Sequence, residues 1–247
     1  MALVDNLEGY WSMDEVSGTR ADSTANGNDL TDNNTVGSLT GIISNGADFE
    51  LANAEYLNRT NANLSTGMKT DRTDWSIQVW LNPESLAVDG DFFTKWTGAP
   101  NRGYIFRLTT AGSITTFITA DGTNFSSGTV VAGITTGSWQ HVVITMDGDG
   151  STSTTMEVWV NGVSKGTAAV ARSPVKWSVT ADFTIADQQG GGQYYDGGMD
   201  EVGIWSRLLT DPEIAELYNS GAGLAYPFTA GGGAVQVHSN LALLGVG

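Results

Sequence analysis

Apolar and polar residues alternate in several short segments of the chain. The clearest segment is 75–82, whose alternate positions are apolar: Trp75, Ile77, Val79 and Leu81. A period of two is typical of a β-strand that buries one face. The same pattern predicts further strands in the segments 103–109, 113–119, 139–146, 156–160 and 182–186.

Turn signals separate these segments. Gly accounts for 32 of the 247 residues, whereas Pro accounts for only 5. Asn-Gly and Asp-Gly pairs tolerate the positive φ that tight hairpins need. Such pairs end at Gly27, Gly46, Gly90, Gly122, Gly148, Gly150, Gly162 and Gly197. Short strands joined in this way predict an all-β, antiparallel sandwich or barrel.

One segment has the pattern of a helix. Thr210 and Glu213 have the spacing of a capping box, and Pro212 falls in the first turn, where its missing N–H is not needed. An apolar stripe follows, formed by Ile214, Leu217 and Tyr218. We expect a short helix that packs on the β-structure and carries no chemistry.

The composition changes after Phe228. The segment 229–234 reads TAGGGA, which is the composition of a flexible linker, and the rest of the chain is apolar and uncharged. We therefore expect one domain over 1–228 and a tail over 229–247. We expect the tail to contact another subunit through Val237, Leu241, Leu243 and Leu244. The alternative is a tail that folds back on its own domain.

Charge and composition exclude several classes of function. The chain has 11 Lys and Arg against 27 Asp and Glu, a formal net charge of -16, so its surface repels phosphate backbones and anionic lipid. It has no Cys, which excludes disulfides and thiol chemistry. Its two histidines, His141 and His238, are too few for a His-rich zinc site.

Neither a leader nor a membrane helix is expected. The first residues, MALVDNLE, have no basic region followed by an apolar one, as a secretory signal would. No apolar run approaches the roughly 20 residues that a membrane helix needs. We therefore expect no membrane insertion.

Three stretches, in the right order, resemble the laminin-G-like jelly rolls of the concanavalin A-like lectin/glucanase superfamily. They are LEGYWSMDEVSGT with DSTANGN over 7–28, GSWQHVVITMD with VWVNG over 137–162, and YDGGMDEVGIWSRLLTDPEI over 195–214. The resemblance spans about residues 3 to 226 and implies a two-sheet jelly-roll sandwich with one short capped helix near its C-terminal end. It does not select a function, because one fold hosts many roles.

A calcium site is the first candidate site. Asp is twice as frequent as Glu, and loop Asp and Asn oxygens are ligands that Ca²⁺ prefers. Asp200 has the parity of Val202 and Ile204, so it points to the core side, where a carboxylate needs a cation or several donors. The resemblance implies a stabilising Ca²⁺ held by Asp22, Asn26, Asn28 and Asp200. The alternative is that Asp200 only accepts backbone N–H bonds from that loop.

A sugar site is the second candidate. Such sites combine an aromatic platform with planar polar groups that bind hydroxyls. Two segments offer this composition, 96–102 together with Tyr104, and 188–195. Their candidate ligands are Trp96, Asn101, Arg102 and Tyr104, with Tyr194 and Tyr195, and we expect Trp96, Tyr194 and Tyr195 to lie in loops. The alternative is that these rings pack in the sandwich or close its ends. Packing is what we expect of Trp11, Trp75, Trp139 and Trp159, which lie on strand faces.

We expect no catalytic residues. In glucanases of the family that the chain resembles, a Glu-x-Asp-x-Glu or Glu-x-Asp-x-x-Glu strand places an acid and a nucleophile on one sheet face. No such spacing occurs here, and Glu157 stands alone on its strand. Asp200 and Glu201 are adjacent, so we expect them on opposite faces.

Two functions remain open. The first is a non-catalytic structural or adhesion subunit of a virion, such as a phage decoration or fibre protein, made in the host cytoplasm and bound to itself or to other virion subunits through the tail. Such a subunit could also bind cell-surface carbohydrate. The alternative is a free or secreted carbohydrate-binding module, or lectin, in an extracellular setting.

Overall fold

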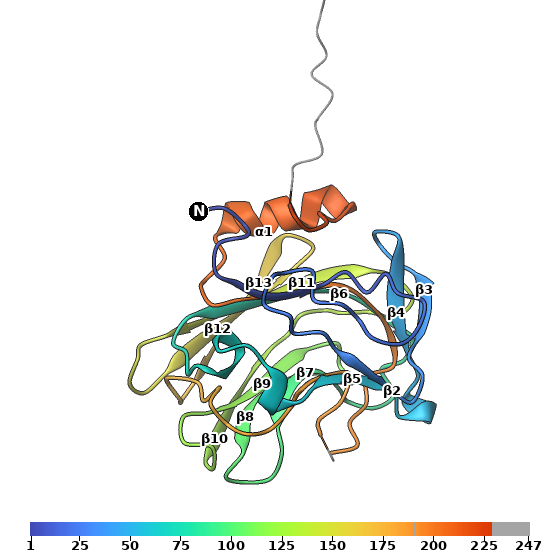
Figure 1. The fold of residues 1–247 in the computed structure, drawn as a ribbon. Coiled ribbons are helices and arrows are strands. Elements are labelled where there is room, and N and C mark those ends of the chain that lie inside the picture. Colours follow the sequence, from blue (N-terminus) through green and yellow to red (C-terminus); the bar gives the residue numbers. More distant parts are fainter. Residues whose placement is uncertain (190, 229–247) are drawn as a thin grey trace, which may run out of the picture.

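A computed structural model describes residues 1–189 and 191–228. Two antiparallel sheets pack face to face, as expected for a jelly-roll sandwich, and the described residues form one α-helix, α1 (Asp211–Tyr218) (Figure 1). The tail residues Val237, Leu241, Leu243 and Leu244 lie outside the described residues, so their expected assembly contact stays a prediction. Within the described residues, no helix is both long and apolar enough to cross a membrane.

The first sheet has eight strands. Along the sheet they run in the order β13 (Val163–Val170), β12 (Thr154–Val160), β11 (Gln140–Gly148), β6 (Trp75–Pro83), β15 (Gly197–Trp205), β4 (Asn45–Phe49) and β3 (Gly37–Thr40), and β1 (Leu7–Trp11) also pairs with β15. The predicted strands at 75–82, 139–146 and 156–160 are therefore neighbours.

The second sheet has seven strands. Their order is β10 (Phe125–Val130), β9 (Ile114–Thr119), β8 (Arg102–Leu108), β7 (Gly90–Trp96), β14 (Phe183–Ile185), β5 (Tyr56–Arg59) and β2 (Thr31–Asn33). Short 3₁₀ turns connect other segments: η1 (Leu51–Asn53), η2 (Asn61–Asn63), η3 (Gly67–Lys69) and η4 (Asn219–Gly221).

The turn chemistry explains the hairpins. Between β12 and β13, Asn161 and Gly162 have φ angles of 53° and 73°, and the flanking residues Val160 and Val163 pair directly. Two successive positive φ values are what a tight two-residue hairpin requires, and Asn-Gly adopts them at low cost. The predicted Asn-Gly turn is therefore confirmed here.

The main core lies between the two sheets. Trp11 and Trp75 are fully buried in it, as expected. Trp139 and Trp159 also pack against the protein, but both are partly exposed and neither lies in this core. A Cβ added to Gly198 would lie 2.8 Å from Cη2 of Trp139, so this ring rests on the backbone of β15 rather than between the sheets.

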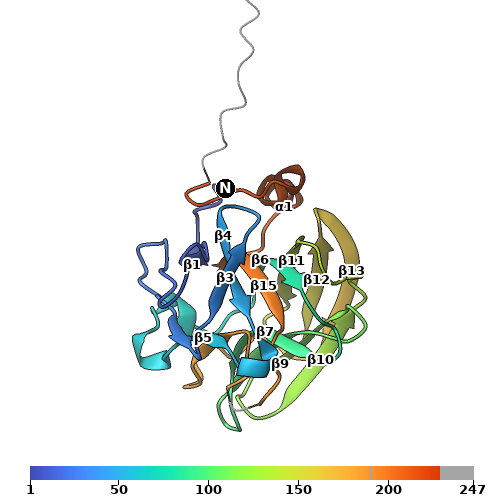
Figure 2. The same ribbon diagram turned by 90° about the vertical axis from the view of Figure 1, so that its right-hand side faces the viewer.

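A second apolar cluster covers part of the outer face of the eight-stranded sheet. Helix α1 contributes Ile214 and Leu217, and these pack with side chains of β11, β15 and both ends of the described chain: Leu3, Leu7, Tyr10, Val143, Trp205, Leu209 and Phe228. Trp159 packs against this cluster. Figures 1 and 2 show α1 on the side of this sheet that faces away from the other one. The α-helix of the described residues therefore lies on the eight-stranded sheet and not on the outer face of the seven-stranded one (Figure 1).

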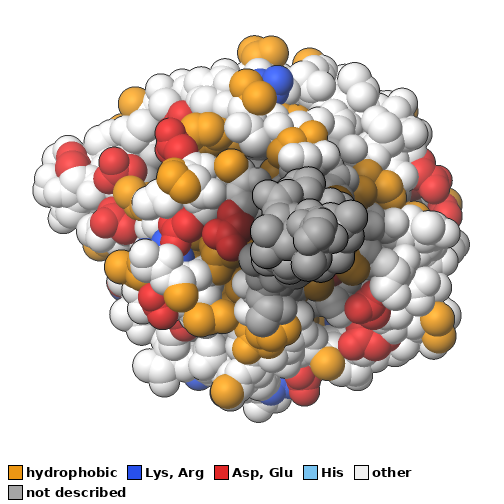
Figure 3. Space-filling view, turned by 90° about the horizontal axis from the view of Figure 1, so that it is seen from above, with side chains coloured by type: hydrophobic (Ala, Val, Ile, Leu, Met, Phe, Trp, Pro, Cys, Tyr) orange, Lys and Arg blue, Asp and Glu red, His pale blue; other side chains and the backbone are white. Residues whose placement is uncertain are grey.

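The expected imbalance of charge is visible on the surface. Figure 3, which views the molecule from the side of α1, shows Asp and Glu scattered across this face and few Lys or Arg among them. No basic patch of the kind that binds a phosphate backbone is visible there.

Candidate functional site

The strands of the seven-stranded sheet point alternate side chains to its outer face. On β8, Tyr104 and Phe106 enter the core, whereas Arg107 is partly exposed. On β9, Phe117 is partly exposed between buried neighbours. Phe125, which begins β10, is 47% exposed. The outer face of the sheet therefore carries aromatic and basic side chains close together.

These side chains surround a hollow of about 210 Å³. Its lining residues come from four neighbouring strands and one loop: Trp96, Arg102, Ile105, Arg107, Phe117, Phe125 and Gln188. The ring of Phe125 meets Trp96 edge-on at a centroid distance of 5.6 Å and Phe117 at 6.0 Å. Trp96 is only 6% exposed, so Phe125 and Phe117 supply the accessible aromatic surface.

Arg102 lies against this aromatic group. Its guanidinium carbon is 5.6 Å from the ring centre of Trp96 and 5.5 Å from that of Phe125. Nη1 donates a 2.7 Å hydrogen bond to the carbonyl of Thr123. Nε is buried and has no hydrogen-bond partner among the described residues.

A second hollow, of about 570 Å³, adjoins the first. Both include Arg107, and the second is also lined by Leu51, Val88, Asp89, Thr110, Gly192 and Gln193. Nε and Nη2 of Arg107 donate to the two carboxylate oxygens of Asp91 at 2.6 and 3.0 Å, and Nη2 also donates to Oε1 of Gln193. The hydrogen bonds to Asp91 raise the pKa of Arg107. The two hollows share Arg107 as a lining residue, and we refer to them together as the two-part groove.

Two carboxyl groups lie beneath this groove. Asp91 is fully buried and ion-paired with Arg107. Asp187 is 2% exposed, and burial together with the charge of Asp91 raises its pKa to about 7. Neither carboxyl group is open to the surface, which an acid and a nucleophile acting on a bound sugar would need.

The structure brings together only part of the expected sugar site. Trp96 ends β7 and Arg102 begins β8, so they are strand residues rather than loop residues, and both line the first hollow. Tyr104 is a correction: it is fully buried and packs against Trp75 and Trp177. Its parity with Phe106 already indicates a core position.

The remaining expected sugar residues lie elsewhere. Tyr195 is a second correction: it is 2% exposed and donates its hydroxyl to the carbonyl of Gly198. Tyr194 is partly exposed, and its ring centre is 6.4 Å from that of Tyr56. Asn101 accepts a hydrogen bond from Thr180 at 2.7 Å and does not line the hollow.

Phe117 and Phe125 are the residues that sequence reasoning missed. The signal for Phe117 was its parity, because it is the large apolar residue that falls out of step with Ile114, Thr116 and Ile118 on β9. Phe125 follows an Asp-Gly turn and has no such signal. Its position near Trp96 depends on how β7, β8, β9 and β10 are placed in the sheet.

The residues expected to bind calcium make hydrogen bonds with neighbouring residues of the protein. One oxygen of Asp22 accepts bonds from the backbone of Tyr10 and Thr24, and the other accepts from the backbone of Asn28. The side-chain amides of Asn26 and Asn28 both donate to the carbonyl of Glu8. In the described ranges, no three His, Cys, Asp or Glu side chains gather to hold a metal. This geometry does not fit the expected calcium set, and calcium binding stays a prediction.

Asp200 is placed differently from its expected position. A β-bulge in β15 at Asp200 and Glu201 interrupts the alternation, so Met199 and Val202 both lie in the main core. The carboxylate of Asp200 accepts backbone N–H bonds from Ile42, Ile43 and Glu201. The backbone-acceptor alternative is therefore the observed one, although the loop is 41–44 rather than 22–28. Burial raises the pKa of Asp200 to about 7.

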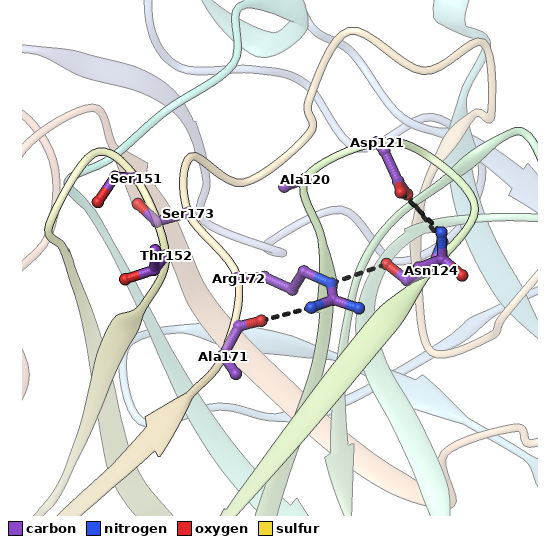
Figure 4. Close-up of a pocket in the computed structure, with 8 residues that line it drawn as sticks. All are labelled: Ala120, Asp121, Asn124, Ser151, Thr152, Ala171, Arg172 and Ser173. Atoms are coloured by element: carbon purple, nitrogen blue, oxygen red, sulfur yellow. Dashed lines mark hydrogen bonds between the residues drawn. The ribbon is translucent and has the colours of Figure 1, made fainter.

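A third hollow, of about 530 Å³, lies at one end of the sandwich between the β9–β10 turn, the β11–β12 turn and residues 171–173. Figure 4 shows Arg172 extending toward Asn124, with Ser151 and Thr152 on the opposite side. Arg172 donates to the carbonyls of Asn124 and Ala171. No aromatic side chain lines this hollow, so it offers a sugar ring no apolar platform.

Comparisons with known proteins agree with this fold. No curated protein matches the chain. Among solved structures, it is similar to domain 4 of AbnA, a GH43 extracellular arabinanase from Geobacillus stearothermophilus solved in complex with arabinotriose, with 19% identity and a TM-score of 0.62 over 85% of this chain and 97% of that one.

Two toxin domains are also similar. The binding domain of Paraclostridial Mosquitocidal Protein 1 shares 15% identity, with a TM-score of 0.67 over 88% of this chain and 52% of that one. The receptor binding domain of botulinum neurotoxin mosaic serotype C/D shares 12% identity, with a TM-score of 0.66 over 87% and 51%. This chain spans about half the length of these toxin chains.

A family model supplies the assignment. The model of the concanavalin A-like lectin/glucanases superfamily matches residues 55–215, which is more than half of the chain. The two antiparallel sheets and the capped helix are the architecture that the resemblance implied. The chain therefore belongs to the concanavalin A-like lectin/glucanases superfamily.

Proposed function

We propose that this chain is a non-catalytic domain that binds a saccharide in the two-part groove on the outer face of its seven-stranded sheet. The observation that carries the proposal is the hollow in which Phe117 and Phe125 present apolar rings beside Arg102 and Arg107. A pyranose or furanose ring has an apolar face that packs on an aromatic side chain, and its hydroxyls need planar polar partners. The groove offers both.

The dimensions of the groove favour an oligosaccharide. The first hollow, of about 210 Å³, lies below the usual range for a small-molecule pocket, but the adjoining hollow of about 570 Å³ extends it across Arg107. The similar domain 4 of AbnA was solved with arabinotriose, which supports a short glycan as the class of ligand.

The two carboxyl groups beneath the groove favour binding without catalysis, because neither is free to act on a bound sugar. Asp91 is neutralised by Arg107, and Asp187 is covered by protein. Neither side chain can reach a glycosidic oxygen from the groove without a rearrangement of the sheet face. We therefore expect the chain to leave bound oligosaccharides intact, which chromatography of the sugars after incubation will check.

A glycan panel with two matched variants tests the proposed function. We expect the full chain to bind at least one neutral or acidic oligosaccharide, with Phe125→Ala weakening binding about tenfold. Trp139→Ala is the control, because Trp139 is a partly exposed aromatic residue that packs on β15 of the other sheet. Absence of binding across the panel, or a loss caused by Trp139→Ala and not by Phe125→Ala, contradicts the proposed site.

We also propose a biological context for this domain. It is a decoration or fibre subunit of a virion, and the alternative is a secreted or free lectin. The virion context depends on residues 229–247, whose apolar composition suits a contact with another subunit. We expect the full chain to form defined oligomers in sedimentation velocity and the chain 1–228 to sediment as a monomer. If both forms are monomers, the tail has no assembly role and the free lectin is favoured.

A further inference from the structure

Arg102 is a cation of the groove whose charge is not paired with a carboxylate of the described residues. The described residues contain four ion pairs, and Arg102 takes part in none of them. It is partly exposed in the first hollow, beside the rings of Trp96 and Phe125. Among its contacts with the described residues, only Nη1 makes a hydrogen bond, which it donates to the carbonyl of Thr123. The guanidinium is thus positioned by two edge-on rings and one carbonyl, and no carboxylate of the described residues pairs with it.

We propose that Arg102 binds a carboxylate carried by the saccharide, so that the ligand contains a uronic acid or a similar acidic sugar. This inference rests on the proposed function of the same groove. The two rings lie on one side of the guanidinium and Nη1 donates to Thr123, which leaves Nη2 to donate a charge-assisted hydrogen bond to a carboxylate oxygen. In this arrangement the sugar ring packs on Phe125 while its carboxylate meets Nη2 of Arg102.

The neighbouring arginines show why Arg102 carries this role. Arg107 lines the same hollow, but both carboxylate oxygens of Asp91 already occupy its Nε and Nη2. Arg172, across the β9–β10 turn, donates Nε and Nη1 to backbone carbonyls and has no aromatic partner in its hollow. Arg102 alone combines an unneutralised charge with an aromatic surface in one hollow.

The charge of the whole chain limits the kind of anion. A net charge of -16 repels polyanions over distances up to about the screening length of roughly 10 Å. A densely sulfated polysaccharide would be repelled by the acidic surface, and Arg102 alone would neutralise only one of its many charges. A glycan with an isolated carboxylate places a single negative charge at Arg102 and leaves neutral rings over the rest of the groove.

The test uses pairs of sugars that differ at one carbon. Methyl glucuronide and methyl galacturonide carry a carboxylate at C6, methyl glucoside and methyl galactoside carry a hydroxymethyl group there, and methyl glucoside 6-sulfate carries a sulfate. NMR titration of the full chain measures each affinity. We expect a preference of about tenfold or more for one carboxylated sugar over its neutral partner, because hydrogen bonds to charged groups are the stronger class.

Three variants separate a charge contact from a general loss of the site. Arg102→Gln is expected to lower the affinity for the carboxylated sugar more than that for its neutral partner and so to abolish the preference. Arg102→Lys should retain part of the preference, and Arg172→Gln, the control, should leave it unchanged. The preference should also fall as salt is raised.

Each result has a defined meaning. Equal binding of acidic and neutral partners, a preference that survives Arg102→Gln, or a stronger preference for the 6-sulfate overturns the inference and leaves the saccharide site intact. If the panel described above finds a neutral oligosaccharide while no acidic sugar binds, the inference also fails alone. If no sugar of any kind binds, the proposed function fails and the inference fails with it.

Discussion

Glu201 is a buried acid without a cation. It is 1% exposed, its Oε2 accepts a hydrogen bond from the hydroxyl of Tyr10, and its Oε1 has no partner among the described residues. Burial raises its pKa to about 8, from 4.5. The folded state therefore holds the proton more tightly than the unfolded state, and the stabilisation from protonation is lost as pH rises from about 4.5 through 8.

Replacing Glu201 by Gln tests this at residue scale. We predict that Glu201→Gln reduces the fall in the free energy of unfolding between pH 6 and pH 9 by on the order of 2 kcal/mol, because Gln cannot ionise. Glu and Gln have the same shape, so the backbone strain from the φ of 49° at this bulge position is equal in the unsubstituted protein and the variant. Urea denaturation at the two pH values measures the change. Glu216→Gln, at an exposed site on α1, should leave the fall unaltered.

The same residue shows where sequence reasoning ends. Asp200 and Glu201 were expected on opposite faces of a regular strand, with Asp200 toward the core. The bulge places both outside the regular alternation. A bulge is selected by contacts that the local sequence does not encode, here the amides of Ile42 and Ile43 around Asp200 and the hydroxyl of Tyr10 at Glu201.

At the scale of elements, helix α1 is anchored by one ion pair. Thr210 and Glu213 form the capping box that the sequence predicted. Both oxygens of Glu213 also accept bonds from Arg207 at 2.8 Å. Arg207 in turn donates to the carbonyls of Ala2 and Asp5, so it joins α1 to the N-terminal segment. Hydrogen bonds from Arg207 and Thr210 hold the pKa of Glu213 at about 2.

Two substitutions separate the cap from the ion pair. We predict that Thr210→Ala lowers the free energy of unfolding by about 1 kcal/mol, as loss of an N-cap does. Glu213→Gln should cost about 3 kcal/mol, because Arg207 is 8% exposed and would be left without its counter-charge. Thermal and urea denaturation at pH 7 give both values. Equal losses would mean that the capping hydrogen bonds, and not the ion pair, hold the helix.

Strand positions and site residues differ in how far the sequence determines them. Alternation locates strands because each strand has one buried face, and the Asn161-Gly162 turn specifies a hairpin by itself. The groove depends on side chains from β7, β8, β9 and β10, which meet only through strand pairing. Composition therefore singled out Trp96 and Arg102, but it could not place Phe125 beside them.

At the scale of the whole molecule, charge is the dominant long-range effect. The segment 229–247 contains no Asp, Glu, Lys or Arg, so the net charge of -16 falls within residues 1–228. Self-repulsion of this size destabilises the folded state, and salt relieves it. The four ion pairs of the described residues weaken with salt as well, but pairs that are partly exposed contribute little each.

We predict that raising NaCl from low concentration to about 0.5 M increases the melting temperature by a few degrees, a gain on the order of 1 kcal/mol. The chain 1–228 should respond like the full chain, because it carries the same net charge. CaCl₂ at matched ionic strength then separates screening from binding. If the expected calcium ligands bind Ca²⁺, CaCl₂ should raise the melting temperature more than NaCl does. EDTA should reverse this additional rise, and Asp22→Asn should reduce it. The saturation of Asp22 and Asp200 by backbone donors instead favours equal rises with both salts. A fall in melting temperature with NaCl would mean that the ion pairs outweigh the self-repulsion.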